Sequence, residues 1–236
     1  MEHKKTAIVT GGSSGMGLAI SRRLRQSGIN VIVFDIQSPP DDFQFFHVDI
    51  RNDVQIKAAL SQIDRVDILI NNAGIYFEKY LEDTTNDEID KMVDINIKGT
   101  YLMTRNVFPK IKAAKGSIVV IASCLGLVPE LTSPLYCTTK AGLIMLTKCL
   151  AQQYADCGVR VNCILPGPID TPLLQNSFHT KEAEEKCASR IPLKRIGQPE
   201  DIANMAAFLV SSEASYITGG AFPVDGGVSS SSLYSK

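Results

Sequence analysis

Near its start the chain reads Thr6-Ala-Ile-Val-Thr-Gly-Gly-Ser-Ser-Gly-Met-Gly17. The apolar run Ala7–Val9, between polar residues and glycines, is typical of a buried parallel strand that ends in a tight turn. After Gly17, apolar residues recur at helical spacing among arginines, which predicts an amphipathic helix. The opening of the chain is therefore predicted to fold as a strand, a glycine turn and a helix.

This turn is suited to bind an anion. Gly11, Gly15 and Gly17 have no Cβ, so the backbone can bend sharply and approach a ligand closely. The following helix directs its unpaired N–H groups and the positive end of its dipole at the same place. A dinucleotide pyrophosphate fits such a site. The spacing differs from the common G-x-G-x-x-G, and the alternative is a plain strand–helix connection that needs glycines.

The composition limits the class of protein. The chain has 236 residues, 44% hydrophobic and 21% charged, with a net charge of -1, as in ordinary globular proteins. This charge gives no reason to expect nucleic acid or an anionic membrane as a partner, and no apolar run is long enough to span a bilayer. The six cysteines form no C-x-x-C pair and the histidines are scattered. We therefore expect reduced thiols, no metal site and a cytoplasmic location.

Strand patterns alternate with helical patterns along the chain. Further strands are predicted at 29–34, 43–48, 66–70, 117–122, 159–165 and 221–224, and further helices at 54–63, 85–97, 99–114, 136–157 and 199–210. This alternation predicts an α/β fold with one Rossmann-like, doubly wound domain over residues 1–236 and a seven-stranded parallel sheet flanked by helices. Residues of about 170–197 are predicted to form a substrate loop region and 227–236 a tail.

Asp35 follows the second predicted strand. In dinucleotide-binding folds the acid that binds the adenosine ribose lies about 20 residues after the glycine turn, which is close to the position of Asp35. A carboxylate there accepts hydrogen bonds from the 2′-hydroxyl and repels a 2′-phosphate, by about 4 kcal/mol per unit charge at close range. The next residues, 36–40, contain no lysine or arginine to receive a phosphate. We therefore expect NAD rather than NADP. The alternative is that Asp35 only caps a loop.

Other polar residues follow the later strands. Asp49 can either reach the adenine amino group or cap the helix predicted at 54–63. The small residues of Asn71-Asn72-Ala73-Gly74 allow a ligand to approach closely, and the asparagines can hold neighbouring strand ends together. Asn96 lies at the junction of two predicted helices, where asparagine is mildly unfavourable, so its side chain is expected to have a specific role.

Tyr136 and Lys140 carry the predicted chemistry. Because they are four residues apart on a helix, their side chains lie on one face. An unperturbed tyrosine, with a pKa of about 10, is a poor base at neutral pH, and a neighbouring ammonium lowers that pKa. Tyr136 can then exchange a proton with a substrate oxygen while hydride moves to or from a nicotinamide, and Ser123 can hydrogen-bond the same oxygen. A Y-x-x-x-K pair alone is often just a solvated helix face.

Together these motifs resemble the short-chain dehydrogenase/reductase family over nearly the whole chain. The matching pieces are Thr10–Gly17, Asn71–Gly74, Asn96, Ser123, Tyr136-Cys-Thr-Thr-Lys140, and Pro166-Gly167 followed by Thr171. The resemblance implies that Tyr136 is the acid/base and Ser123 orients the substrate. It also implies that Lys140 binds the nicotinamide ribose and tunes Tyr136, and that Asn96 holds a water in a proton relay to Lys140. The NAD contacts are then expected at Gly11, Ser13, Ser14, Gly15, Met16, Gly17, Asp35, Ile36, Asp49, Ile50, Asn72, Ala73, Gly74, Tyr136, Lys140, Pro166, Gly167, Ile169 and Thr171.

The stretches 192–201 and 225–227 are similar to a branch of that family that contains 3-oxoacyl carrier-protein reductases and sugar or sterol alcohol dehydrogenases. The resemblance implies a homotetramer, or a dimer, built through the helices at 99–114 and 136–157. Asp35 departs from the acyl-chain reductases of the branch, which usually take NADPH. We expect an NAD-dependent enzyme that interconverts a secondary alcohol and a ketone. The alternatives are a 3-oxoacyl carrier-protein/CoA reductase and a non-catalytic NAD-binding regulator.

The substrate, a small molecule, is expected to bind between residues 125–135 and 173–195. An apolar wall is predicted there from leucines and a valine, unless these residues simply belong to the core: Leu125, Leu127, Val128, Leu131, Leu173 and Leu174. Cys124 and Cys137 flank the catalytic positions and are expected to be packing residues rather than redox sensors.

Overall fold

A computed structural model describes residues 4–175 and 180–230. Its strands form one seven-stranded sheet, parallel at every pairing, in the order β3-β2-β1-β4-β5-β6-β7. The strands are β1 (Thr6–Thr10), β2 (Asn30–Asp35), β3 (Gln44–His47), β4 (Ile68–Asn71), β5 (Ser117–Ile121), β6 (Arg160–Pro166) and β7 (Ala221–Val224). The predicted fold class is confirmed.

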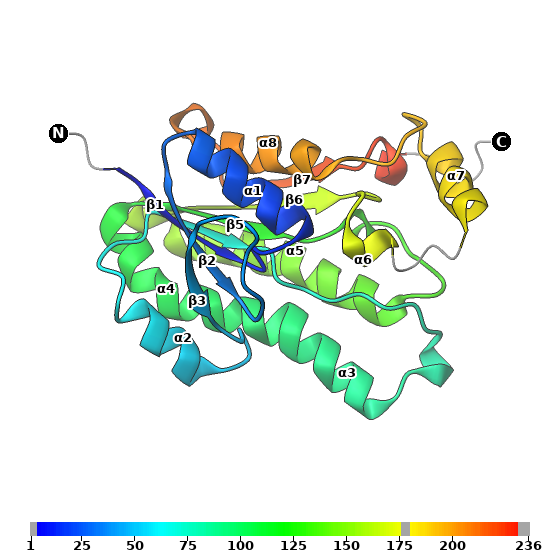
Figure 1. Cartoon of the computed structure of the whole chain (residues 1–236), viewed down its shortest axis with the longest axis horizontal. Coiled ribbons are helices and arrows are strands. Elements are labelled where there is room, and N and C mark those ends of the chain that lie inside the picture. Colours follow the sequence, from blue (N-terminus) through cyan, green and yellow to red (C-terminus); the bar gives the residue numbers. More distant parts are fainter. Residues whose placement is uncertain (1–3, 176–179, 231–236) are drawn as a thin grey trace.

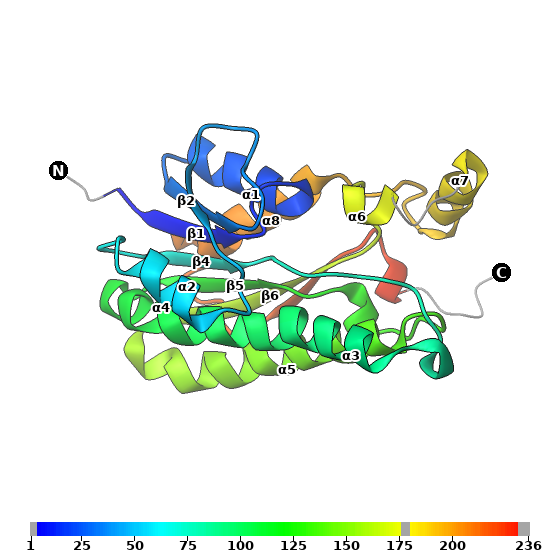
Figure 2. The same cartoon turned by 60° about the horizontal axis from the view of Figure 1, so that its bottom comes forward.

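Helices cover both faces of the sheet (Figure 1 and Figure 2). One face carries α2 (Asp53–Leu60), α4 (Thr100–Ala114) and α5 (Pro134–Tyr154), and α3 (Asn86–Val93) extends this layer. The opposite face carries α1 (Gly15–Gln26) and α8 (Pro199–Val210). Two further helices, α6 (Pro172–Gln175) and α7 (Lys181–Arg190), lie beyond the end toward which the strands point (Figure 1).

Two apolar cores result from this layering. Successive residues of β1 point to opposite faces: Ile8 belongs to the core that contains Met103 of α4, whereas Val9 belongs to the core that contains Ile20 of α1. Both faces of the strand are therefore buried, which explains why its sequence is a continuous apolar run rather than an alternating one.

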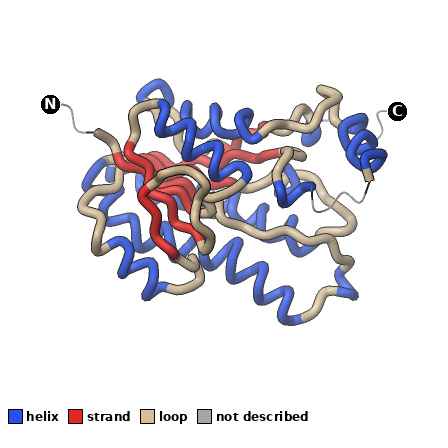
Figure 3. The backbone as a smooth tube through the Cα atoms, in the orientation of Figure 1, coloured by secondary structure: helices blue, strands red, loops and turns tan. Residues whose placement is uncertain are grey.

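The chain builds the sheet toward one edge and then toward the other. Strands β1, β2 and β3 lie next to one another in sequence order. Strand β4 then pairs with the side of β1 opposite to β2, and β5 to β7 follow in order to the other edge. The red strands of Figure 3 run side by side in this arrangement. The carboxyl ends of β1 and β4 thus meet where the strand order reverses, which is where sheets of this type bind ligands.

Some helix boundaries differ from the prediction. Helix α5 begins at Pro134 rather than Tyr136, because proline suits the first helical position and Ser133 supplies the cap residue. The helix predicted at 85–97 ends as α3 at Val93 and continues as a π-helix over Asp94–Gly99. In α2 the capping side chain is Asn52, which accepts hydrogen bonds from two backbone N–H groups of the first turn.

The predicted substrate loop region contains α6 and α7 in its described part, while residues 176–179 lie outside the described residues. Of the predicted tail, 231–236 also lie outside them. Val228–Ser230 forms a 3-10 turn, which Asp225 holds by accepting hydrogen bonds from the N–H groups of Gly227 (2.9 Å) and Ser229 (2.8 Å). Within the described ranges, no helix combines the length and apolar character needed to cross a membrane.

Candidate active site

The glycine turn joins the end of β1 to the start of α1. Gly11 has a φ of +63°, a conformation that favours glycine. A Cβ on Gly17 would lie only 2.0 Å from the carbonyl oxygen of Gly11. The turn can therefore close as tightly as it does only with glycine at both positions, and it leaves bare backbone at the N-terminus of α1.

Asn72 joins the ends of β4 and β1. Its Nδ2 donates to the carbonyl oxygens of Thr10 and Gly11, both at 3.0 Å. The Thr10 hydroxyl accepts hydrogen bonds from the N–H groups of Asn72 (3.0 Å) and Ala73 (3.1 Å). The expectation that an asparagine of this segment holds neighbouring strand ends together is confirmed.

Asp35 lies at the end of β2, beside the glycine turn. Its Oδ2 accepts a hydrogen bond from the N–H of Ser13 (3.0 Å), and its Oδ1 accepts one from the N–H of Gln37 (3.1 Å). Asp35 therefore does cap its own loop, and in addition it holds the glycine turn against β2. Each oxygen keeps a further lone pair, so the carboxylate can still accept hydrogen bonds from a ligand.

A cavity of about 410 Å³ opens at this edge of the sheet. The predicted cofactor residues that line it are Gly11, Ser14, Gly15, Met16, Asp35, Ile36, Asp49, Ile50, Asn72, Ala73, Gly74 and Thr171. The predicted cofactor residues outside its lining are Ser13, Gly17, Tyr136, Lys140, Pro166, Gly167 and Ile169. With a bare backbone cradle at one end and carboxylates at the other, the residues present fit a dinucleotide.

Arg51 is a lining residue that sequence reasoning missed. Its guanidinium holds the Asp49 carboxylate through Nε (3.0 Å to both oxygens) and Nη2 (2.6 Å), which lowers the pKa of Asp49. Because Asn52 caps α2, the interpretation of Asp49 as that cap is wrong. The residues that directly follow Asp35 contain no base, and Arg51 lies beyond the next strand. Arg51 follows Asp49 by two positions, and a scan of the next strand end would have found it.

Tyr136 and Lys140 lie on one face of α5, as predicted. The Lys140 Nζ is 5.4 Å from the centroid of the Tyr136 ring, and it donates a hydrogen bond to the carbonyl of Ile121 at the end of β5 (3.0 Å). Ser123 lies just beyond β5, where its side chain lowers the pKa of Tyr136, and its hydroxyl accepts a hydrogen bond from the N–H of Leu125 at 3.1 Å. The end of β5 and the first turns of α5 thus bring the three side chains together.

The pKa values of Tyr136 and Lys140 differ from the expectation. Burial raises the pKa of Tyr136 above its ordinary value, and Ser123 lowers it by less. Burial also lowers the pKa of Lys140 to about 8, because the ammonium loses solvation. For the chain by itself, the pKa of Tyr136 therefore lies above its ordinary value and not below it, because desolvation of the phenol is the largest cause. The effect of the Lys140 ammonium on Tyr136 stays a prediction.

Asn96 has a specific role, as its position predicted. It is buried in the π-helix between α3 and α4. Its Oδ1 accepts from the N–H of Ile75 (2.9 Å), and its Nδ2 donates to the Ile75 carbonyl (3.0 Å) and to Thr139 Oγ1 (3.2 Å). The Thr139 hydroxyl donates to the carbonyl of Tyr136 (2.8 Å). Asn96 therefore ties the loop after β4 to the helix that carries Tyr136 and Lys140.

The residues of the predicted apolar wall do not belong to either core. Leu127, Leu131 and Leu173 are 53%, 82% and 41% exposed, so the alternative that they are core residues is wrong. The loops that carry them border the site from two sides: residues 124–133 precede α5, and Leu173 lies in α6. Cys124 is buried and Cys137 half-buried.

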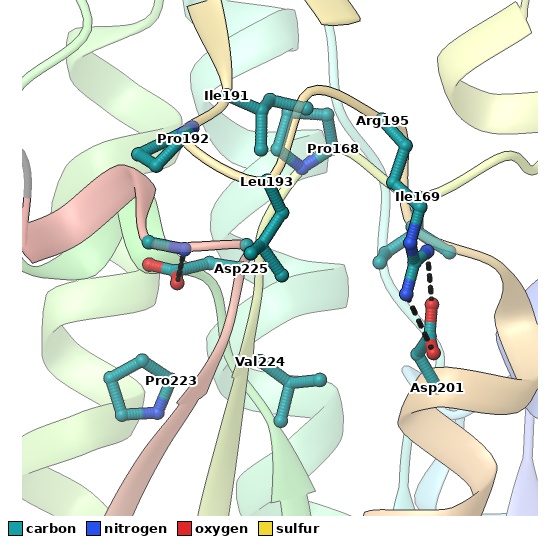
Figure 4. Close-up of a pocket in the computed structure, with 13 residues that line it drawn as sticks. Pro168, Ile169, Ile191, Pro192, Leu193, Arg195, Asp201, Pro223, Val224 and Asp225 are labelled. Carbon is teal, nitrogen blue, oxygen red and sulfur yellow. Dashed lines mark hydrogen bonds and ion pairs between the residues drawn. The ribbon is translucent and has the colours of Figure 1, made fainter.

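A second cavity, of about 500 Å³, lies between the loop after α7 and the end of β7 (Figure 4). Ile169, Ile191 and Leu193 contribute to its apolar walls. Its charged side chains are engaged within the protein: Arg195 pairs with Asp201 at 2.8 Å (Figure 4), and Asp225 holds the 3-10 turn. Tyr136 and Lys140 do not line this cavity. Ile169, a predicted cofactor contact, faces it instead.

The comparisons with known proteins agree with this geometry. A family model described as enoyl-(acyl carrier protein) reductase matches residues 11–229. The chain belongs to the short-chain dehydrogenase/reductase family. It is 35% identical to oxidoreductase UcpA of Escherichia coli, over 94% of each chain. Its structure is similar to that of aldohexose dehydrogenase from Thermoplasma acidophilum, with a TM-score of 0.95, 32% identity, and 99% and 97% of the two chains covered.

Solved relatives in this family hold either nicotinamide cofactor. The 3-ketoacyl-(acyl-carrier-protein) reductase of Brucella melitensis, complexed with NADH, is 34% identical, with a TM-score of 0.88 and 95% and 98% of the chains covered. ElxO, with NADP bound, is 29% identical, with a TM-score of 0.90 and coverage of 97% and 100%. A nicotinamide cofactor thus belongs to this family in both forms.

Proposed function

We propose that the protein is an NAD(H)-dependent oxidoreductase that interconverts a secondary alcohol and a ketone. The observation that carries the proposal is the grouping at the start of α5. The Lys140 ammonium lies 5.4 Å from the centroid of the Tyr136 ring, and Ser123 is close enough to lower the pKa of the same phenol. The substrate is a small-molecule alcohol or ketone.

Tyr136 is the proposed acid/base. When bound, the nicotinamide supplies the donor or acceptor of the hydride. In ketone reduction the Tyr136 hydroxyl donates its proton to the carbonyl oxygen, and burial, which keeps this phenol protonated, favours that direction. In alcohol oxidation Tyr136 takes the hydroxyl proton. It must then start as phenolate, which the positive charge of Lys140 stabilises. Ser123 hydrogen-bonds the same substrate oxygen.

The other site residues keep the roles that the family resemblance implies. Lys140 binds the nicotinamide ribose, and Asn96 holds a water that relays protons to Lys140. The position of Asn96 supports this role, because its side chain fixes both Ile75 and Thr139 beside the buried ammonium. The proposed cofactor contacts are those predicted from Gly11 to Thr171, apart from Ile169, which lines the second cavity.

NAD is the proposed cofactor. Asp35 lines the cavity with a carboxylate that already holds two backbone N–H groups and therefore cannot easily turn away from a 2′-phosphate. A phosphate there meets a like charge, at a cost of about 4 kcal/mol at close range. Arg51, the basic residue in the lining, is held by Asp49 and so is not free to offset that charge.

A 3-oxoacyl carrier-protein or CoA reductase is the second candidate. The likeness to the Brucella melitensis reductase, which is complexed with NADH, favours it, because that protein shows that the nicotinamide form does not decide between the two activities. The difference lies in the substrate: a thioester with a long anionic carrier, or a free alcohol. A panel of sterols, aldohexoses, hydroxy acids and 3-oxoacyl thioesters, each assayed with NAD(H) and NADP(H), tests the two candidates together.

The same panel tests Tyr136. Replacing it with phenylalanine removes the proton donor and should lower kcat by about 10²- to 10⁴-fold, with the Kd for NAD unchanged within two-fold. Tyr154→Phe, which removes a hydroxyl further along α5, is the matched control and should keep kcat. Turnover by Tyr136→Phe equal to that of the parent would exclude Tyr136 from the mechanism.

We further propose a single domain, a homotetramer and a cytoplasmic location. Exposed apolar side chains on α4 and α5 support assembly through these helices: Tyr101 is 54% and Met145 58% exposed. Sedimentation velocity of the parent and of Met145→Glu tests the assembly. The parent should sediment as a tetramer, and the variant as a smaller species.

A further inference from the structure

Tyr76 contacts the catalytic tyrosine of the proposed reaction. It lies in the loop after β4, and its ring meets that of Tyr136 edge-on, with the centroids 4.9 Å apart and an angle of 76° between the planes. The loop is held in place at Lys79, whose N–H donates to the carbonyl of Thr132 at 2.6 Å. Tyr76 is therefore held beside Tyr136, between the loop after β4 and the loop before α5.

The Tyr76 hydroxyl is the middle of a chain of hydrogen bonds. It donates to Glu78 Oε1 at 2.8 Å and accepts from the Ser133 hydroxyl at 3.3 Å. Both hydroxyl protons of the chain are thus used within the protein. What remains for a ligand is lone pairs: one on the Tyr76 oxygen, two on the Ser133 oxygen and those of the Glu78 carboxylate. This chain of hydrogen bonds therefore offers acceptors, and it suits a ligand group that donates a hydrogen bond.

The charges around Tyr76 are negative. Burial raises the pKa of Tyr76, the hydrogen bond with Ser133 lowers it, and the negative charges of Glu78 and Glu130 raise it. The ammonium of Lys79, in the same loop, is paired with Glu88 at 2.7 Å. The hydroxyl protons of Tyr76 and Ser133 and the ammonium of Lys79 are engaged within the protein, so an anionic substrate group at this place would meet the Glu78 carboxylate and be repelled.

We propose that Tyr76 is a specificity-determining residue, and that with Glu78 and Ser133 it selects uncharged substrates that carry a second hydroxyl group besides the reacting one. This inference rests on the proposed function, since it assumes that the alcohol reacts at Tyr136. It favours polyols and sugars over carboxylates and over thioesters of an anionic carrier. The second hydroxyl donates to the acceptors of the chain while the reacting hydroxyl lies at Tyr136 and Ser123.

Three probes on one ring test the selection: cyclohexanol, cyclohexane-1,2-diol and 3-hydroxycyclohexanecarboxylate. The parent protein should oxidise the diol with a kcat/KM roughly five- to ten-fold above that of cyclohexanol, as expected for one added hydrogen bond. The carboxylate should be oxidised less efficiently than cyclohexanol. Equal kcat/KM for all three, or the highest for the carboxylate, would overturn the inference.

Tyr76→Phe keeps the ring and removes the hydroxyl. The diol should lose its advantage and the carboxylate should improve, because the Ser133 proton is then free to be donated, while cyclohexanol changes by less than two-fold. Tyr80→Phe makes the same change on an exposed side chain of the same loop and should leave all three probes as in the parent. A merely structural role of Tyr76 would lower all three equally, which would contradict the inference.

Glu78→Gln keeps an oxygen that can accept from Tyr76 and removes the charge. The carboxylate probe should gain several-fold in kcat/KM and the diol should change by less than two-fold. The inference and the proposed function fail in different ways. If neither the three probes nor the aldohexoses are oxidised while a sterol or a hydroxy acid of the panel is, the inferred substrate class is wrong and the reaction stands. If the panel shows no oxidation or reduction at all, both are wrong.

Discussion

The two ends of the candidate site are built from different kinds of contact. At the cofactor end most polar contacts involve backbone atoms: Asp35 accepts from two N–H groups, and Asn72 donates to two carbonyls. At the substrate end they join side chains from separate loops, as Tyr76 does with Ser133 and Tyr136. A site made of backbone is part of the fold itself. Changes at the cofactor end should therefore affect folding and binding together, whereas changes at the substrate mouth should affect selectivity alone.

The largest effect is expected from Gly17→Ala. The added Cβ would lie 2.0 Å from the Gly11 carbonyl oxygen, and because both groups are backbone no rotamer change relieves the overlap. We expect the Kd for NAD to rise more than about 100-fold and the free energy of unfolding to fall by about 3 kcal/mol. Cofactor titration and urea denaturation measure the two.

Gly142→Ala, on an exposed position of α5, is the control for this prediction. Its Cβ would meet only the end of the Ile97 side chain, at 3.3 Å, so stability should rise by up to about 1 kcal/mol, as for alanine in a helix. Similar behaviour of the two variants would show that the cofactor end is no more constrained than the surface of a helix.

The cofactor end could be predicted from sequence because its signals are local. Glycines at Gly11 and Gly17 are needed by one turn, and Asp35 ends the very next strand, so a short stretch of chain contains both the geometry and the ligand-binding groups. The fold could be predicted for a related reason. Strands buried on both faces, such as β1, are continuous apolar runs, and their alternation with helices leaves few possible topologies.

The second-largest effect is expected from Lys140→Met, which should raise the free energy of unfolding. A pKa of about 8 instead of 10.5 means that keeping this buried lysine charged costs about 3 kcal/mol of folding free energy at pH 7. Methionine removes that cost and also the hydrogen bond to Ile121, worth about 1 kcal/mol. The variant should therefore be about 2 kcal/mol more stable at pH 7, and the proposed function requires that it lose turnover.

The pH dependence gives the sign of this effect. Below pH 8 the parent carries the full cost of the buried charge. As the pH rises from about 8 to 10.5 the folded protein loses the proton before the unfolded chain does, so the cost and the advantage of the variant both disappear. Lys148→Met, on an exposed position of the same helix, should show a stability change below about 0.5 kcal/mol at every pH. A difference between parent and Lys140→Met that is independent of pH would contradict the assignment.

Asp35→Ala should have a smaller effect, mainly on the cofactor, with a loss of about 1 kcal/mol of stability because the N–H groups of Ser13 and Gln37 lose their acceptor. It removes the acceptor for the ribose 2′-hydroxyl and the charge that repels a 2′-phosphate, so kcat/KM with NAD should fall about ten-fold and that with NADP should rise. Asp42→Ala removes an equal charge from an exposed position of the same loop and should leave the ratio of the two cofactors unchanged. Parallel loss of activity with both cofactors would mean that Asp35 only holds the turn through Ser13.

The substrate mouth could not be predicted in the same way, because its contacts depend on how distant segments meet. Tyr76 and Ser133 are far apart in sequence, and neither belongs to a periodic pattern. The π-helix that contains Asn96 also has no local signal, since its sequence continues an ordinary helical pattern. The pKa of Tyr136 was predicted in the wrong direction because the sequence shows the neighbouring charge of Lys140 but not the burial of the phenol.

Arg51→Gln should give the smallest effect. It tests whether the loss of a side-chain contact at the cofactor end changes ligand selectivity without changing folding, as expected for the substrate mouth. The Arg51–Asp49 pair is largely open to solvent, with side chains 44% and 27% exposed, so its loss should weaken NAD binding only two- to three-fold, or about 0.5 kcal/mol. Nicotinamide mononucleotide, which has no adenine, should bind as to the parent. NADP should lose more affinity than NAD, because Asp49 then adds its uncompensated charge to that of Asp35. Arg65→Gln breaks an ion pair of the same spacing, with Asp67 at 2.7 Å and near the opposite ends of the strands, and should affect none of the three ligands. A gain in NADP binding by Arg51→Gln would show instead that Arg51 does not shield the carboxylates, and that the preference for NAD is fixed by backbone geometry alone.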